Sequence, residues 1–144
     1  MGKTYKTGIA RRVVNSLTKK GILFGLGPRG GHILTTVGRR TGRERQVPVQ
    51  LIERDGQRWL VSPYGPVGWV HNARTAGKVT LRRGRRTSES AVDELAPDQA
   101  APVLREYLEM VPIVRPYFDV TTDSPTEDFV REAPRHPVFL VRDP

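Results

Sequence analysis

Short apolar runs separated by turn residues constrain the fold of this chain more than any other feature. The 144 residues include 14 Gly and 12 Pro, which break the sequence into short segments. Runs rich in β-branched residues, such as residues 32–37, alternate with turn signals such as Asp55-Gly56. The pattern predicts one domain with one core, built from short antiparallel strands.

The turn signals and the apolar periodicities divide the chain into about six strands and a few helices. Strands are predicted over residues 32–37, 47–54, 58–62, 78–83, 87–94 and 136–141, and helices over residues 68–76, 97–110 and 125–133. Pro137 near the start of the last strand predicts an edge position, because proline cannot donate a ladder hydrogen bond. The expected class is α+β, mainly β: a small antiparallel barrel with helices packed outside it.

The amino-terminal segment, residues 1–30, is predicted to be a basic amphipathic helix with a Gly-rich lead-in to the domain of residues 31–144. Apolar residues recur at helical spacing over about 7–19, among basic residues and no acidic one. Two interpretations stand: residues 1–20 bind an anionic membrane surface, or they cover the barrel.

The composition also bounds the cellular setting and the chemistry. No apolar run of about 18 residues and no secretory signal is found, so a cytoplasmic location is expected, with peripheral attachment to the inner face of the membrane as an alternative. The absence of Cys excludes disulfides and thiolate nucleophiles. The three His residues fit no metal pattern, and no metal is expected.

Positive charge is concentrated in the first part of the chain. Residues 1–86 hold 19 Lys and Arg against three acidic residues, whereas residues 87–144 hold five against twelve. Four arginines lie in residues 38–45, on a Gly-punctuated loop between two predicted strands. Because the planar guanidinium pairs two oxygens at once, this loop is a candidate phosphate or carboxylate site. A solvated hairpin loop is the equally weighted alternative.

A second candidate segment, residues 62–72, combines small residues with Trp69 and Asn72. Small residues allow a ligand to approach the backbone, and Trp69 offers a flat wall for a heterocycle. Asn72 offers directional hydrogen bonds. A helix entry with Trp69 buried in the core is the simpler interpretation of the same residues.

The motif over residues 33–48, followed by Trp69 and Asn72, resembles the deazaflavin-dependent nitroreductase and quinone reductase family of actinobacteria. The similarity extends from about residue 31 to residue 141 and implies a split β-barrel fold. It also implies coenzyme F-420, an 8-hydroxy-5-deazaflavin with a lactyl phosphate and an oligoglutamate tail. The implied activity is transfer of a hydride from the reduced cofactor to a quinone, an activated alkene or a nitro compound, with a lipid-like acceptor among the candidates.

The resemblance also implies residue roles. The residues implied to hold the phosphate and the tail are Arg39, Arg40, Thr41, Gly42 and Arg45. The residues implied to line the ring are Val47 and Pro48 on one side and Ser62, Trp69 and Asn72 on the other. Tyr117 and Tyr64 are the candidate proton donors. The segment from Ser62 to Trp69 is shorter than the lysine-bearing loop of the best-known members.

Several alternatives remain open at this point. One alternative is a protein that binds a deazaflavin or a fatty acid without turnover, and another is a reductase of the same fold that uses flavin mononucleotide (FMN). A nucleic-acid-binding role is not expected, because few aromatic residues lie among the arginine clusters. A homodimer is left open by the similarity to split-barrel flavoproteins.

Overall fold

A curled, seven-stranded antiparallel sheet forms the body of the molecule. The computed structural model describes residues 30–142. The strands are β1 (Gly31–Val37), β2 (Glu44–Gln50), β3 (Ile52–Arg54), β4 (Gln57–Val61), β5 (Lys78–Arg83), β6 (Arg86–Glu94) and β7 (Val138–Arg142). They are ordered β2-β1-β5-β6-β7-β4-β3 across the sheet, and every pair is antiparallel.

The sheet curls because strands that follow one another in the chain occupy its two opposite edges. β2 pairs with β1 at one edge, and β3 pairs with β4 at the other. Leu51 alone separates the two strands, and its amide donates a hydrogen bond to the carbonyl of Gly30 at 2.9 Å. The two edges are therefore brought together at Leu51, which gives the sheet the shape of a half-barrel.

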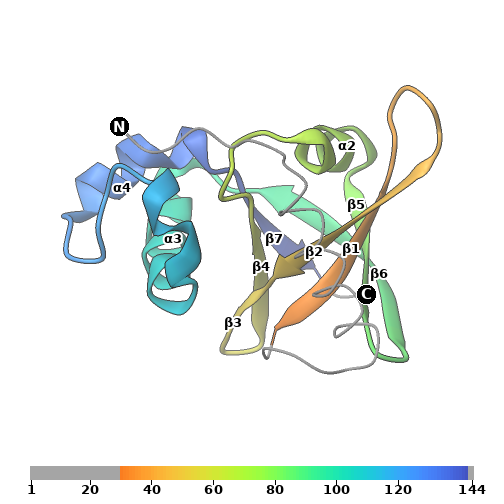
Figure 1. The fold of residues 1–144 in the computed structure, drawn as a ribbon, viewed down its shortest axis with the longest axis horizontal. Coiled ribbons are helices and arrows are strands. Elements are labelled where there is room, and N and C mark those ends of the chain that lie inside the picture. Colours follow the sequence, from red (N-terminus) through yellow and green to blue (C-terminus); the bar gives the residue numbers. More distant parts are fainter. Residues whose placement is uncertain (1–29, 143–144) are drawn as a thin grey trace.

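Helices cover this sheet at two places (Figure 1). α3 (Pro97–Met110) and α4 (Thr126–Glu132) lie together on one side, next to β3 and β4, with the short 3-10 helices η1 (Pro112–Tyr117) and η2 (Ala133–Arg135). α2 (Gly68–Ala76) lies at one end of the sheet, beside β1 and β5.

The buried side chains form two clusters. One lies between α3, α4 and the outer side of β3 and β4, around Leu104, Leu108 and Phe129. The other is enclosed by the curled sheet and closed by α2, around Leu34, Leu60 and Leu81. No helix among residues 30–142 is both long and apolar enough to span a bilayer.

The elements agree with the sequence-based predictions apart from shifts of up to three residues at strand ends, the largest at β2, which begins at Glu44 inside the predicted loop, and three further corrections. α2, α3 and β5 have the predicted bounds. The predicted strand 47–54 is wrong in its continuity, because the chain crosses from one sheet edge to the other at Leu51. The predicted start of α4 is also displaced, because Ser124 accepts a hydrogen bond from the Thr121 amide and the helix begins at Thr126.

The edge position predicted for the last strand is wrong as well. β7 lies inside the sheet, between β6 and β4. Pro137 comes just before the strand, where no ladder hydrogen bond is needed from it, and its carbonyl accepts a hydrogen bond from the Ser62 amide at 2.9 Å. The helix expected over residues 7–19 lies outside the described residues.

A buried polar network fixes the start of β7 against α4. Glu132 and His136 are 5% and 2% exposed, and His136 Nε2 lies 2.7 Å from Glu132 Oε2. The Asp119 amide donates to the same carboxylate oxygen at 3.1 Å, and His136 Nδ1 donates to the Pro63 carbonyl at 2.8 Å. The Phe118 ring stacks on the imidazole with centroids 3.7 Å apart. The buried polar groups of this network therefore have hydrogen-bond partners, and removing one partner would destabilise the fold.

Replacing Glu132 should separate the contribution of its charge to stability from that of its hydrogen bonds. Glu132→Ala leaves a buried imidazole nitrogen and the Asp119 amide without their partner, so we expect the free energy of unfolding to fall by about 2–4 kcal/mol. Glu132→Gln keeps an oxygen that can accept from the Asp119 amide, so it should cost less than half as much. Urea unfolding of the three proteins measures both effects, and a loss under 0.5 kcal/mol in Glu132→Ala would contradict this account.

Candidate functional site

The arginine loop between β1 and β2 is closed by its own backbone. The Gly38 amide donates to the Arg43 carbonyl at 2.7 Å, and the Gly42 amide donates to the Gly38 carbonyl at 2.8 Å. Gly42 has a φ of +70°, a conformation that glycine adopts without strain. The Thr41 hydroxyl accepts from the Arg43 amide at 3.2 Å. The loop is thus a compact turn whose backbone is held in place.

Asn72 joins this loop to α2. Its side chain is 4% exposed, and its Oδ1 accepts from both the amide and the guanidinium of Arg39, at 3.2 and 3.1 Å. Its Nδ2 donates to the Thr36 hydroxyl at 3.1 Å. One buried amide therefore connects the end of β1, the arginine loop and the helix.

A cleft of about 440 Å³ lies between the loop and the start of α2. The loop carries Arg39 and Arg40, the adjoining end of β2 carries Arg45, and the opposite side of the cleft carries Trp69. The first turn of α2 also borders the cleft and has no acidic residue, so the helix dipole adds positive potential to that of the guanidiniums. The cleft is therefore cationic at one side and aromatic at the other.

The pairing of β1 with β2 explains how the charged and apolar parts of the cleft meet. Arg45 is opposite Thr36, and Val47 is opposite Leu34. Residues two apart on a strand share a face, so Arg45 and Val47 lie on the same side of β2. Val47 packs against the enclosed core. The charged entrance thus passes directly into an apolar wall.

Most of the residues predicted for the cofactor lie together at this cleft. Those among its lining residues are Arg39, Arg40, Thr41, Arg45, Val47, Trp69 and Asn72. Gly42 belongs to the turn behind them. Pro48 follows Val47 on β2 and points to the other face of the strand. Ser62 is fully buried, and its hydroxyl donates to the Gly65 carbonyl.

The two candidate proton donors lie outside the lining of the cleft. The rings of Tyr64 and Tyr117 meet edge to face with centroids 4.8 Å apart, and both pack against the cluster around α3. Tyr64 belongs to the segment that connects β4 to α2, three residues before Val67, which borders the cleft. Neither phenol is therefore among the groups that a ligand in the cleft would contact in this structure.

Four lining residues were missed in the sequence: Gly38, Gln46, Val67 and Gly68. Gly38, Gln46 and Gly68 are adjacent in sequence to Arg39, Arg45 and Trp69, and Val67 lies two residues before Trp69, so the signal was their position beside predicted residues. Trp69 itself also contacts the enclosed core, with its ring centroid 5.7 Å from that of Phe139. The structural and the binding interpretations of Trp69 are thus compatible. Among residues 30–142, no group of three or more His, Asp and Glu is arranged to hold a metal ion.

Comparison with known proteins defines the class of this fold and site. The family described as F420H(2)-dependent quinone reductase matches residues 9–124. A solved structure described as an F420-H2 dependent reductase is similar with a TM-score of 0.54 and 22% identity, over 79% of this chain and 95% of that one. A structure described as a domain-swapped dimer has a TM-score of 0.56 and 20% identity, over 92% and 96% of the two chains. A NimC/NimA family protein from Clostridium acetobutylicum has a TM-score of 0.53 and 16% identity, over 94% and 82%.

The chain belongs to the F420H(2)-dependent quinone reductase family. It is therefore an oxidoreductase whose cofactor is coenzyme F-420, and its fold is the half-barrel predicted from the sequence. The cleft suits the chemical parts of that cofactor, since the phosphate and the glutamate tail are anionic and the deazaflavin is flat.

The link made by Asn72 can be tested without any ligand. Asn72→Ala removes a buried amide that bonds Arg39 and Thr36, so we expect the free energy of unfolding to fall by about 1–3 kcal/mol. Thr36→Val removes one of these bonds and should cost about 1 kcal/mol. In a double-mutant cycle the two changes should be coupled by at least about 0.5 kcal/mol. Additive effects would show that the contact contributes nothing to stability.

Proposed function

We propose that the cleft beside the arginine loop is where this chain binds coenzyme F-420 and passes its hydride to a quinone. The observation that carries the proposal is the meeting of three arginines with an indole ring across one cleft of about 440 Å³. The guanidiniums of Arg39, Arg40 and Arg45 hold the phosphate and the tail. The cofactor, when bound, supplies the hydride.

The remaining residues shape and support this binding. Val47 and Trp69 bound the ring, and Thr41 and Gly42 keep the loop closed around the phosphate. Asn72 positions Arg39 through the two hydrogen bonds to its Oδ1. Pro48 lies on the edge strand β2, where a missing amide donor is tolerated. Ser62 acts one step further away, because its bond to Gly65 fixes the segment that leads to α2.

The acceptor is proposed to be a quinone that stacks on the exposed face of the deazaflavin, with activated alkenes and nitro compounds as further candidates. Trp69 is only partly buried, so the mouth of the cleft keeps an aromatic surface. Planar acceptors gain stacking energy against such a surface. A lipid-like acceptor would suit residues 1–20 if these bind an anionic membrane surface, which sedimentation with anionic vesicles would detect. Self-association into a homodimer, as in the domain-swapped neighbour, is testable in the same instrument.

Fluorescence titration with oxidised coenzyme F-420 tests the binding site. The variant Arg40→Glu/Arg45→Glu reverses two of the three charges in the cleft, and we expect it to weaken binding at least about 100-fold. The matched control is Arg131→Glu/Arg142→Glu, which changes the net charge equally on α4 and β7. This control should stay within about threefold of the wild type.

A parallel titration with FMN distinguishes the cofactors. We expect FMN to bind at least tenfold more weakly than F-420, because it lacks the glutamate tail. Equal loss of F-420 binding in both double variants would contradict the proposed site, since it would reflect net charge alone. Tighter binding of FMN would contradict the cofactor assignment of the cleft.

The proton-donor role predicted for Tyr64 and Tyr117 is tested by turnover of a soluble naphthoquinone. If the Tyr64 hydroxyl donates the proton, Tyr64→Phe lowers kcat by about 100-fold and leaves the Kd for F-420 unchanged. Tyr117→Phe is the partner variant, because the two rings are in contact. A kcat within twofold of the wild type in both variants would assign the proton to solvent.

A further inference from the structure

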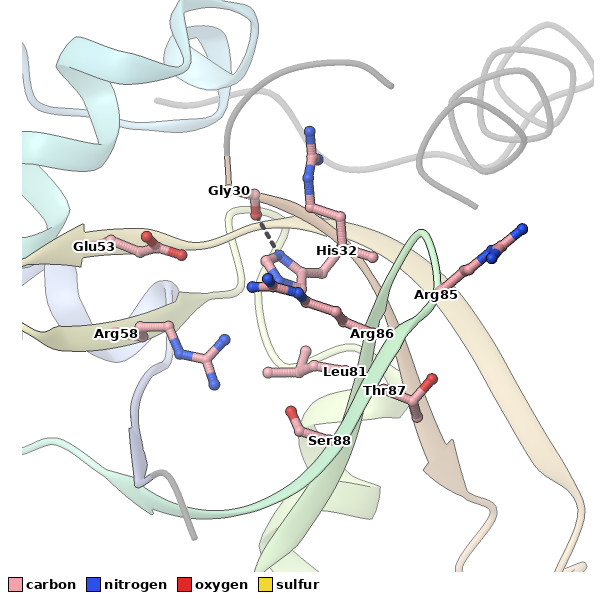
Figure 2. A pocket seen from close by; sticks show the side chains of 10 residues that line it. Gly30, His32, Glu53, Arg58, Leu81, Arg85, Arg86, Thr87 and Ser88 are labelled. Carbon is pink, nitrogen blue, oxygen red and sulfur yellow. Dashed lines mark hydrogen bonds between the residues drawn. The ribbon is translucent and has the colours of Figure 1, made fainter. Parts of the chain in front are cut away.

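A second cavity, of about 640 Å³, opens at the end of the curled sheet opposite the F-420 cleft. It is bordered by the start of β1, by β3 and β4, and by the β5–β6 hairpin (Figure 2). His32 belongs to this cavity and Gly38 to the cleft, six residues further along β1. At a rise of about 3.3 Å per residue, the two sites are about 20 Å apart.

The register of β5 and β6 turns two arginines toward this cavity. Leu81 is paired with Ser88, and Arg83 is paired with Arg86. Because residues two apart share a face, Arg83 and Arg86 lie on the same face as Leu81, which belongs to the enclosed core. Like charges directly opposite each other destabilise a strand pair. Repulsion between Arg83 and Arg86 therefore destabilises this end of the β5–β6 pair.

The other walls add charge on the same face. His32 shares a face with Leu34, and Arg58 shares a face with Leu60, both leucines being in the enclosed core. Glu53 lies opposite Arg58 in the β3–β4 pair. In Figure 2 the side chains of Arg58 and Arg86 point into the space between the strands from opposite sides, whereas Arg85 points outward from the hairpin tip.

Among the described residues that line the cavity, positively charged side chains outnumber negatively charged ones. Four arginines and one carboxylate, that of Glu53, are among the lining residues. Residues 1–29 contain no Asp or Glu, and Asp143 is the one acidic residue outside the described part. One further carboxylate would still leave a cationic cavity. Arg83 is fixed at its rim, because Nη1 donates to the Gly31 carbonyl at 2.8 Å.

His32 adds a titratable group to the wall of this cavity. Its Nδ1 donates to the Gly30 carbonyl at 2.8 Å, so a second proton would enter at Nε2. Burial lowers the pKa of His32 below its ordinary value, and the nearby charges of Arg58 and Arg83 lower it further, whereas the Gly30 bond and Glu53 act in the opposite direction. A bound anion would oppose the effect of the arginines and raise this pKa.

We propose that this cavity is a second anion-binding site, which takes a small soluble ligand carrying two or more negative charges on phosphate groups. Arg58 and Arg86 hold the ligand from opposite walls, Arg83 contacts it from the rim, and the Ser88 hydroxyl on the same face donates a further hydrogen bond. The site is separate from the arginine loop and does not depend on F-420 binding.

Calorimetric titration of the full chain with inorganic pyrophosphate, at 150 mM salt and pH 7, tests this proposal. We expect one saturable site per chain at this cavity, distinguished by its variants from any weaker binding at the arginine loop. Arg58→Gln and Arg86→Gln should each weaken binding at the cavity at least tenfold, because they remove charge from opposite walls. The matched control Arg131→Gln loses the same charge on α4 and should stay within twofold, as should Arg45→Gln in the F-420 cleft.

The affinity for F-420 is measured on the same proteins, which separates this site from the proposed function. Arg86→Gln should leave F-420 binding unchanged and thereby also show that the variant is folded. Failure of F-420 binding with retained pyrophosphate binding would contradict only the cofactor site. No pyrophosphate binding at 1 mM, or equal weakening in Arg131→Gln, would overturn the second site.

The imidazole of His32 gives a readout at the cavity itself. The pKa of His32, followed through its ring proton by NMR and assigned with His32→Gln, should rise on saturation with pyrophosphate. Arg86→Gln should abolish this rise at the same ligand concentration. An unchanged pKa in the saturated wild type would place the bound ligand elsewhere and overturn the proposal.

Discussion

The structure depends on the crossing of the chain at Leu51, from one edge of the sheet to the other. Without that crossing, β2 and β3 would form one long strand, and the sheet would be open. The hydrogen bond between the Leu51 amide and the Gly30 carbonyl extends the β1–β2 pairing up to this crossing, and the curled sheet encloses the core around Leu34, Leu60 and Leu81. The cleft beside the arginine loop and the second cavity lie at the two ends of that enclosure.

Rigidity at the cleft comes from a few buried polar contacts rather than from the loop alone. Asn72 carries three hydrogen bonds that join a strand, a loop and a helix. A reaction in which the cofactor supplies the chemistry requires the protein mainly to orient a flat ring and to hold its anionic groups. The site proposed above, made of arginines, an indole and an amide, meets that requirement.

Local signals predicted the elements well, because turns and caps are encoded by adjacent residues. The bounds of α2, α3 and β5, and the grouping of Arg39, Arg40 and Arg45, were available from the sequence. The break at Leu51 and the interior position of β7 were not, since both follow from which strands pair across long separations. The cavity formed by Arg58, Arg83 and Arg86 was hidden for the same reason: its arginines come from different strands.

Strand β1 is sensitive to changes in its length, because its inward side chains, His32, Leu34 and Thr36, serve three different parts of the molecule. They belong in turn to the second cavity, the core and the support of the cleft. Deletion of a single residue within β1 would shift the parity of every later position and exchange the inner for the outer face. The second cavity, the core and the support of the cleft therefore all require the same number of residues in β1. The two ends of the barrel can change by substitution but not by insertion or deletion within this strand.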